Sequence, residues 1–262
     1  MRRLLPCYVT LLCLFLLAPI AIVVILAFSG PGYLQFPPRS YSLYWFVRFL
    51  GDPQWRQSLW YSVVIGVIAC TAASVVGFFA AYAFVRGSFA AKKLLLSLLL
   101  LPIIVPTVIT SIAIYFLSAR LHLVGNILWI GICHAVIALP VVLLILLSSL
   151  QGVDINLERA ALNLGASPVR VFMKVVIPLA APGLISAALF AFLTSFDELI
   201  IALFLTGVRV QTLPVRIWNS LEMEIEPTIA AVSAFLIGVT GVVLLLDSLL
   251  RGRRGSAVRA QR

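Results

Sequence analysis

The chain has 262 residues, of which 63% are hydrophobic and only 11% are charged, and its formal net charge is +10. This composition excludes a soluble globular domain and indicates a membrane protein that crosses the bilayer several times. In such a protein the positive charge is typical of Lys and Arg residues that face anionic lipid, so it does not indicate nucleic-acid binding.

The first apolar run, residues 7–28, follows Arg2 and Arg3. Its length suffices to cross roughly 30 Å of hydrocarbon, whereas the apolar core of a cleaved signal peptide has only about 7–15 residues. We therefore predict an uncleaved first span. The segment after it, residues 29–58, is rich in Gly, Pro and aromatic residues. It predicts an outer segment with an interfacial aromatic belt and a short helix along the membrane, although a ligand-binding aromatic cluster is an alternative.

Residues 59–85 predict the second span, with small side chains that suit close helix packing. Residues 94–118 predict the third, which Pro102 and Pro106 should kink because proline removes a backbone donor. The kink fits a helix that lines a pathway and equally fits a packing kink. Residues 127–150 predict the fourth span, in which we expect His134 to be a structural hydrogen-bonding residue rather than a ligand.

The polar stretch of residues 151–177, which we call the knuckle, separates the fourth span from the fifth. Asp154 or Asn156 can cap a first short helix, and Gly165 can end it in a left-handed turn. Ser167 can cap a second short helix over residues 168–176, with Pro168 at its first position. Two capped helices make a rigid feature that suits docking to a partner, whereas the alternative is an ordinary amphipathic loop.

The fifth predicted span, residues 179–205, contains Asp197 and Glu198, with Thr194 close enough in helical spacing to share one polar patch. A carboxylate in hydrocarbon costs roughly 3 kcal/mol or more, so we expect it to face water, a partner or a cation. A structural role for both acids is the alternative. The sixth span is predicted over residues 227–250, with Asp247 four residues before Arg251, a spacing that favours a local ion pair.

Charge predicts the orientation. Thirteen Lys and Arg residues fall in the two terminal segments, the turn after the second span and the knuckle, and six fall in the other connections. This bias places both termini and the knuckle in the cytoplasm. We therefore predict an all-α, multi-pass inner-membrane protein in which residues 1–262 form a single transmembrane domain of six spans.

The knuckle also carries a motif. Ala160, Ala161, Gly165 and Pro178 follow a spacing of Glu-Ala-Ala, three residues, Gly, nine residues and Ile-x-Leu-Pro, with Val175 and Ile177 at the Ile and Leu positions. Arg159 stands at the Glu position, and Glu158 precedes it. With this spacing between two spans, the chain resembles the membrane permease subunits of binding-protein-dependent ABC importers, which have a type I importer fold.

The resemblance implies a coupling-helix loop that docks into a cytoplasmic ATPase. The residues it assigns to docking are Glu158, Arg159, Ala160, Ala161, Gly165, Ala166, Ser167 and Pro168. It further implies a second membrane subunit, expected to be non-identical, two ATPase subunits that bind ATP and Mg²⁺, and an extracytoplasmic substrate-binding protein. Under it, Thr194, Asp197 and Glu198 are the candidate substrate-pathway residues.

The segments SFDELIIALFLTG, TLPVRIW and EP, which lie between residues 195 and 227, resemble the polyamine (spermidine and putrescine) permeases. Permeases for iron, phosphonates or opines remain alternatives. A stand-alone secondary transporter or channel, with Asp197 and Glu198 as ion carriers, is a further alternative. A membrane-embedded enzyme is disfavoured, because we find no nucleophile with a base, no metal-type cysteine spacing and no phosphate loop.

Overall fold

The structure is a computed structural model that describes residues 4–32, 35–207, 209–223 and 227–259. It contains only helices and loops within that part of the chain, apart from one isolated bridge between Ser29 and Tyr41. Two compact units are present: unit 1 comprises Met1–Leu59 and Val215–Val242, and unit 2 comprises Trp60–Pro214 and Val243–Arg262. The expectations that rest on Arg2, Arg3, Glu226 and the side chain of Arg251, the expected partner of Asp247, lie outside what the structure describes.

Unit 1 contains α1 (Leu4–Ala27), α2 (Tyr44–Gly51) and parts of three further helices, α3 (Pro53–Arg86), α11 (Leu213–Met223) and α12 (Thr228–Arg259). Its small core joins Ala27, Trp45, Ala230 and Ala231. The indole N–H of Trp45 donates to the Gly30 carbonyl at 3.2 Å, which fixes the irregular segment that follows α1. The short helix expected in the outer segment is α2.

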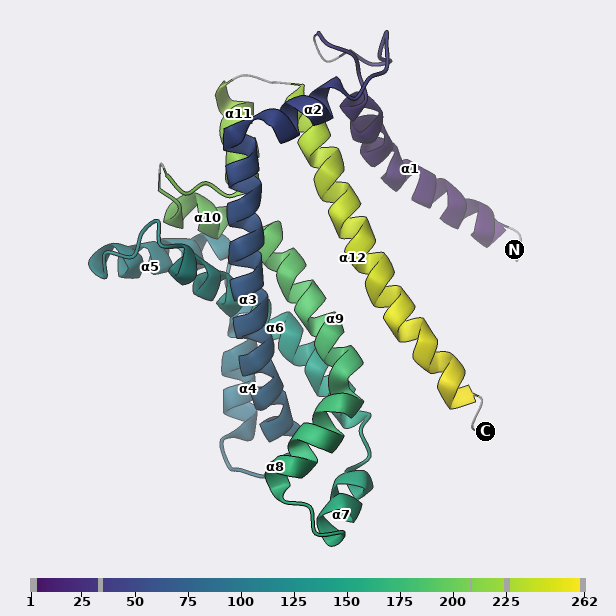
Figure 1. The fold of residues 1–262 in the computed structure, drawn as a ribbon, viewed down its shortest axis with the longest axis vertical. Coiled ribbons are helices and arrows are strands. Elements are labelled where there is room, and N and C mark those ends of the chain that lie inside the picture. Colours follow the sequence, from purple (N-terminus) through teal and green to yellow (C-terminus); the bar gives the residue numbers. More distant parts are fainter. Residues whose placement is uncertain (1–3, 33–34, 208, 224–226, 260–262) are drawn as a thin grey trace. The chain divides into compact units, whose positions relative to one another are not determined.

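Unit 2 is built around α3, α6 (Ile127–Gln151) and α9 (Ile177–Phe196). Their buried faces consist largely of Ala, Val, Leu and Phe, so the three helices pack closely. At the knuckle, α7 (Ile155–Asn163) and α8 (Pro168–Val171) lie beyond the ends of α6 and α9 (Figure 1). The remaining elements of this unit are α4 (Lys92–Leu100), η1 (Leu101–Ile103), α5 (Thr107–Arg120), η2 (Phe172–Val176) and α10 (Ile200–Leu205).

Glycine permits the close approach of α6 and α9. A Cβ atom at Gly183 of α9 would overlap the side chain of Ser149 on α6. A Cβ atom at Gly77 of α3 would lie 2.6 Å from Cγ1 of Val142 on α6, which is also too close. Small residues therefore set the spacing of these helices, as membrane helix packing requires.

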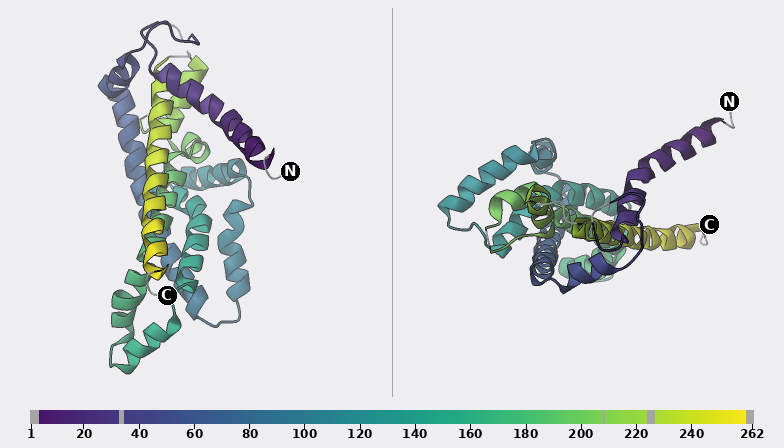
Figure 2. Two further views of the ribbon diagram at one scale, coloured as in Figure 1. Left: turned by 90° about the vertical axis from the view of Figure 1, so that its right-hand side faces the viewer. Right: turned by 90° about the horizontal axis from the view of Figure 1, so that it is seen from above.

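The third predicted span is broken rather than merely kinked. Lys92–Ile103 and Thr107–Arg120 meet at an angle of 98°, and the sharp bend between α4 and α5 is visible in Figure 2. Pro102 lies in the 3₁₀ turn η1, and Pro106 adopts an extended conformation immediately before α5. Two prolines four residues apart remove two helical donors, so the chain bends between them.

The fifth predicted span differs at both ends from residues 179–205. The apolar helix begins earlier, because Pro168–Phe196 is one long helical segment through α8, η2 and α9. Pro178 does not break it: the turn before that proline is a π-helix, in which Ile177 N–H bonds to the Phe172 carbonyl. A wider turn accommodates a residue that has no N–H.

At its other end the segment stops at Phe196, immediately before the two acids. The 20 residues of α9 span about 30 Å, which is the thickness of the hydrocarbon layer. Asp197 and Glu198 therefore lie in a break between α9 and α10, after a helix long enough to cross the hydrocarbon layer, and α10 begins at Ile200.

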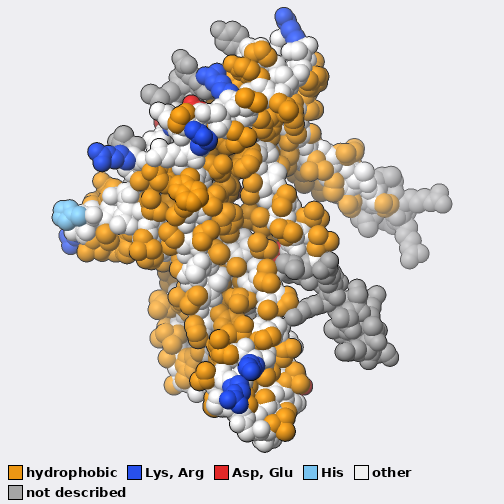
Figure 3. All heavy atoms as spheres, viewed as in Figure 1, with side chains coloured by type: hydrophobic (Ala, Val, Ile, Leu, Met, Phe, Trp, Pro, Cys, Tyr) orange, Lys and Arg blue, Asp and Glu red, His pale blue; other side chains and the backbone are white. Residues whose placement is uncertain are grey.

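Among the described residues, five helices are long and apolar enough to cross a membrane, or six if the bent pair of α4 and α5 counts as one span. The face shown in Figure 3 is largely hydrophobic along the helices of unit 2, and basic side chains appear near the knuckle and also elsewhere on this face. The chain is thus an all-α membrane protein. The connection between α10 and α12 holds one helix that the sequence analysis did not predict, α11.

Candidate functional site

The first half of the knuckle folds as its local sequence indicates. The Asp154 carboxylate accepts a bond from Asn156 N–H at 2.9 Å and so caps α7. Gly165 has φ +84°, and it follows the last turn of the helix. Gly165 N–H bonds to the Leu162 carbonyl and Ala166 N–H to the Ala161 carbonyl, which together form a Schellman motif.

The second helix of the knuckle begins directly after this turn. The Ser167 hydroxyl accepts a bond from Arg170 N–H, and Pro168 occupies the first helical position. Only one residue, Ala166, separates the left-handed glycine from the new cap. The two helices are therefore joined by a turn whose backbone groups are largely satisfied, and the turn is rigid for that reason.

The tip of the knuckle exposes apolar side chains. Leu164 is 89% exposed and Val169 is 73% exposed, on either side of the Gly165 turn. Of the expected docking residues, Arg159, Ala160, Gly165, Ser167 and Pro168 are exposed, and Ala161 and Ala166 are half-buried. An exposed apolar tip of this kind on a rigid support is suited to insertion into a partner's groove.

Glu158 is the exception among these residues, because its side chain points into its own chain. It is 7% exposed and forms an ion pair with Arg86 at the end of α3, in which Arg86 Nη2 lies 2.7 Å from Glu158 Oε1. Arg86 Nε donates to the same oxygen at 2.8 Å, and Tyr82 donates its hydroxyl to Oε2 at 3.4 Å. Removing one partner of such a buried pair typically costs about 3–5 kcal/mol.

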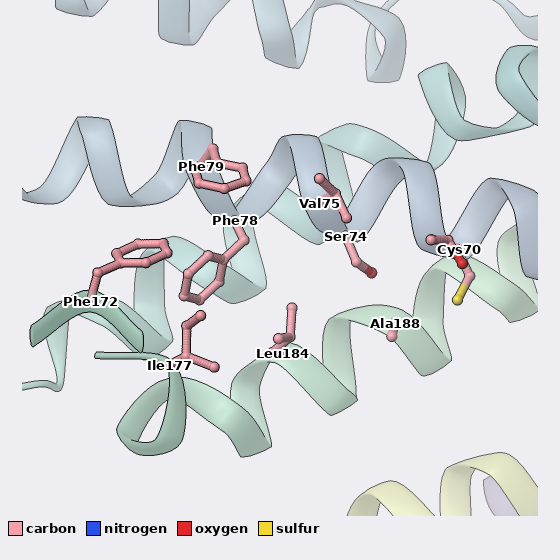
Figure 4. Close-up of a pocket in the computed structure, with 10 residues that line it drawn as sticks. Cys70, Ser74, Val75, Phe78, Phe79, Phe172, Ile177, Leu184 and Ala188 are labelled. Atoms are coloured by element: carbon pink, nitrogen blue, oxygen red, sulfur yellow. The ribbon is translucent and has the colours of Figure 1, made fainter. Parts of the chain in front are cut away.

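Aromatic side chains of α3 also pack against the second half of the knuckle, which follows the Gly165 turn. The ring of Phe172, in η2, lies 5.8 Å from Phe78, 5.7 Å from Phe79 and 5.1 Å from Tyr82 of α3. Figure 4 shows Phe172 beside Phe78 and Phe79 at one end of an apolar groove of about 340 Å³ between α3 and α9. The end of α3 thus contacts both halves of the knuckle.

The two acids at the other end of α9 have different surroundings. Oε1 of Glu198 accepts bonds from Ile200 N–H at 2.9 Å and Ile201 N–H at 3.1 Å, so this carboxylate caps α10. Asp197 is exposed, and its carboxylate has no hydrogen bond or ion pair to any residue that the structure describes. Thr194 is near in sequence, but its hydroxyl donates to the Phe190 carbonyl at 2.8 Å. The expected polar patch therefore reduces to one open carboxylate.

His134 lies close to this break. Its Nδ1 is 2.9 Å from the hydroxyl oxygen of Ser195, and the side chain is only 1% exposed. The bond joins α6 to the last turn of α9, two residues before Asp197. His134 is thus a structural hydrogen-bonding residue, as the sequence analysis expected.

Sequence reasoning did not find Arg86, Tyr82 and Ser195. The sequence did offer a hint for Arg86. It is an arginine at the end of an apolar helix, and Glu158, which stands one residue before the motif's Glu position, is an acid that could pair with it. Tyr82 and Ser195 gave no such hint, since their roles depend on which helix faces meet. In the described part of the chain, no group of three or more His, Cys, Asp or Glu side chains could hold a metal ion.

Comparison with known proteins adds to this geometry. Residues 73–255 match the family model described as "Binding-protein-dependent transport system inner membrane component", which covers more than half of the chain. The putrescine transport system permease protein PotI of Escherichia coli is 32% identical over 236 residues, covering 87% of this chain and 84% of its own length. The spermidine/putrescine transport system permease protein PotC of Haemophilus influenzae is 27% identical, covering 90% and 91%.

Another relative differs in its named substrate. The trehalose transport system permease protein SugB of Mycobacterium tuberculosis is 34% identical over 205 residues, covering 76% of this chain and 73% of its own. Among solved structures, a bacterial ABC transporter involved in the import of the acidic polysaccharide alginate matches with a TM-score of 0.72 and 16% identity. That match covers 95% of this chain and 94% of the other. At this identity the structural match shows a shared fold.

Proposed function

We propose that this chain, which belongs to the family of binding-protein-dependent transport system inner membrane components, imports a polyamine such as putrescine or spermidine. The chain is a permease subunit of an ABC importer and a multi-pass inner-membrane protein, and family membership removes the alternative of a stand-alone transporter or channel. The membrane-embedded enzyme is removed in the same way, because permease subunits of this family are not catalytic.

The observation that carries the polyamine proposal is the open carboxylate of Asp197. It lies at the break between α9 and α10 without a cation from the described part of its own chain. A diammonium or triammonium substrate offers the charge that such a group lacks, and the attraction offsets the cost of dehydrating both. Two relatives named for putrescine or spermidine, each matching most of this chain, support the same substrate class.

Sequence identity by itself does not choose the substrate. The trehalose permease is as similar in identity as the putrescine permease, although it covers less of the chain. Iron, phosphonate and opine permeases therefore remain alternatives, but anionic substrates such as phosphonates suit an exposed carboxylate poorly.

The substrate test measures ATP hydrolysis by the complete importer in lipid vesicles. Putrescine and spermidine, delivered by the binding protein, should stimulate hydrolysis, whereas trehalose and a phosphonate should not. Stimulation by trehalose or the phosphonate alone would overturn the polyamine proposal while leaving the permease function intact. A complex that hydrolyses ATP without response to any of these compounds would point to another substrate.

In the complete importer, the proposed arrangement has two permease subunits, two ATPase subunits and one binding protein on the outer side. This chain binds neither ATP nor Mg²⁺, both of which belong to the ATPase subunits. Residues 151–177 dock to one of them through the exposed tip of the knuckle, with Leu164 and Val169 as its apolar contacts. Closing of the ATPase dimer would then move the knuckle as a rigid body and open or close the pathway.

This arrangement requires the knuckle and both termini in the cytoplasm, as the charge bias predicts. The test is a cysteine at Ser167, which is exposed at the start of α8. A membrane-impermeant thiol reagent should label Ser167→Cys in inverted vesicles and leave it unlabelled in intact cells. Labelling from the outer side of intact cells would reverse the proposed orientation.

A further inference from the structure

We propose that Arg86 is a positioning residue that fastens α3 to the knuckle through Glu158, so that motion of the docked ATPase is transmitted to α3. The inference rests on the proposed docking of the knuckle. It goes beyond docking, because it concerns how motion of the knuckle is transmitted to the helices of unit 2.

The connectivity of the chain explains why such a fastening is needed. The knuckle continues directly into α6 on one side and into α9 on the other, so those two helices follow its motion through the covalent chain. α3 has no such link, since Arg86 is 72 residues from Glu158 in sequence. Any coupling of α3 to the knuckle must pass through non-covalent contacts.

Arg86 makes those contacts with two different acceptors. Its Nε and Nη2 both approach Oε1 of Glu158, and Nη2 also donates to the Val153 carbonyl at 2.8 Å. Glu158 belongs to α7, and Val153 belongs to the turn that joins α6 to α7. One guanidinium group therefore holds both the helix of the knuckle and its entry, which a planar group with several donors can do and a lysine ammonium cannot do in the same way.

Tyr82 connects this ion pair to the aromatic cluster. Its hydroxyl donates to Glu158, and its ring packs edge-on against Phe172 at a centroid distance of 5.1 Å. Phe172 lies in the π-helical turn that follows α8, so α3 holds the knuckle on both sides of the Gly165 turn. The polar contact and the aromatic contact are adjacent on α3, and they act as one attachment.

Burial makes the ion pair suitable for transmission. The side chains of Arg86 and Glu158 are 15% and 9% exposed, so water and salt screen the attraction less than at a fully exposed pair. The position of the acid is consistent with this role. Glu158 stands one residue before the motif position that Arg159 occupies, and a shift of one residue on a helix turns a side chain by about 100°. Here the turn directs the carboxylate to α3, and Arg159 is exposed instead.

The test uses the complete importer in vesicles and measures substrate imported per ATP hydrolysed, with labelled putrescine as the probe. If putrescine is not imported, the probe is the compound that stimulates hydrolysis in the substrate test. The variants are Arg86→Gln, Glu158→Gln and the double variant. Lys93→Gln is the matched control, because it removes a basic charge from an exposed residue seven positions from Arg86.

Each single variant should keep the ATPase bound while the transport-to-hydrolysis ratio falls by roughly tenfold, within the usual range for coupling between sites. The double variant should be no worse than either single one, because the same interaction is already lost. Lys93→Gln should keep the wild-type ratio. Arg86→Lys should recover part of it, since it keeps the charge near Glu158 but loses the shared contact with Val153.

Three results would overturn the inference: an unchanged ratio in both single variants, loss of the ATPase from both, or losses that add in the double variant. If Arg86→Gln does not insert into the membrane, Arg86→Lys serves as the only test. A wild-type transport-to-hydrolysis ratio in Arg86→Lys would contradict the need for one guanidinium group that binds both Glu158 and Val153. Failure of the proposed docking is recognised separately, since the wild-type chain would then not retain an ATPase at all.

Discussion

The acids found toward the two ends of α9 differ in the partners that their carboxylates have. At the knuckle end, Glu158 is buried and ion-paired with Arg86. At the other end, Glu198 caps α10 through two backbone bonds, and Asp197 stays open. The comparison teaches that an acid beside an apolar helix is explained by what satisfies it. Of these three acids, only Asp197, whose carboxylate has no partner in the described part of the chain, is our candidate for contact with the substrate.

The largest effect should come from the backbone of the knuckle. Gly165→Pro should abolish transport, because proline cannot adopt the φ of +84° that the Schellman turn requires. The chain should still insert, since the spans are unchanged. Uptake and co-purification of the ATPase with the solubilised chain measure the outcome.

Gly165→Asn is the matched control, because asparagine tolerates the left-handed region better than other residues with a side chain, and no atom lies within 4 Å of a Cβ placed there. It should retain much of the uptake. Normal transport and normal ATPase binding in Gly165→Pro would remove the docking role of the knuckle. Glu158→Ala should be milder than Gly165→Pro, because it removes one attachment and leaves the exposed tip in place.

Asp197 and Glu198, which follow α9, should differ in how much a neutral substitution lowers polyamine uptake. Asp197→Asn should cut polyamine uptake severely while the assembled complex still hydrolyses ATP, because it removes the open charge without changing the side chain's size. Glu198→Gln should have a small effect, since the amide oxygen can still accept the bonds from Ile200 and Ile201. Uptake of putrescine at several concentrations separates binding from turnover.

If Glu198→Gln is the more harmful of the two, the charge of Glu198 matters beyond capping, and the comparison between the acids is wrong. If both variants transport normally, the polyamine proposal loses its physical support in this chain.

A smaller effect is expected where α6 and α9 approach each other between the two ends. Gly183→Ala should lower the thermal stability of the purified chain in detergent, because its Cβ would overlap Ser149 and overpacking typically costs about 1–3 kcal/mol. Gly238→Ala is the control, since nothing lies within 4 Å of a Cβ at that position of α12 and alanine favours helix.

The double variant Gly183→Ala with Ser149→Gly should recover stability, because it returns the missing space on the facing helix. An unchanged melting temperature in Gly183→Ala alone would show that α6 and α9 are not held at a fixed distance and can move apart to admit the added methyl group.

Local chemistry let the sequence predict several features correctly. Composition indicated a membrane protein, and the lengths of the apolar runs indicated that its spans are helices. The caps at Asp154 and Ser167, the left-handed turn at Gly165 and the helix start at Pro168 were all predictable, because each depends on residues within a few positions along the chain. The motif that spans these residues indicated the family for the same reason.

The limits of the spans were less predictable. Hydropathy indicated one helix through Asp197 and Glu198, but the side chain of Glu198 competes for the backbone donors of Ile200 and Ile201 and so favours a helix start there. In the same way, the fifth span was predicted to start at residue 179, but the helix is continuous from Pro168, because a π-helical turn accommodates Pro178. Apolar composition measures whether a segment prefers lipid and says little about where its helix is continuous.

The partners of Glu158 and His134 could be learned only from the tertiary structure. Glu158 meets Arg86 across 72 residues, and His134 meets Ser195 across 61. These partners depend on the crossing of α3, α6 and α9, which small residues such as Gly77 and Gly183 permit and which no local pattern specifies. The sequence by itself therefore determined the class, the family and the knuckle's backbone. The packing of helices determined that Glu158 faces inward toward Arg86 and that no described residue pairs with Asp197, whereas the cap by Glu198 is a local contact with Ile200 and Ile201.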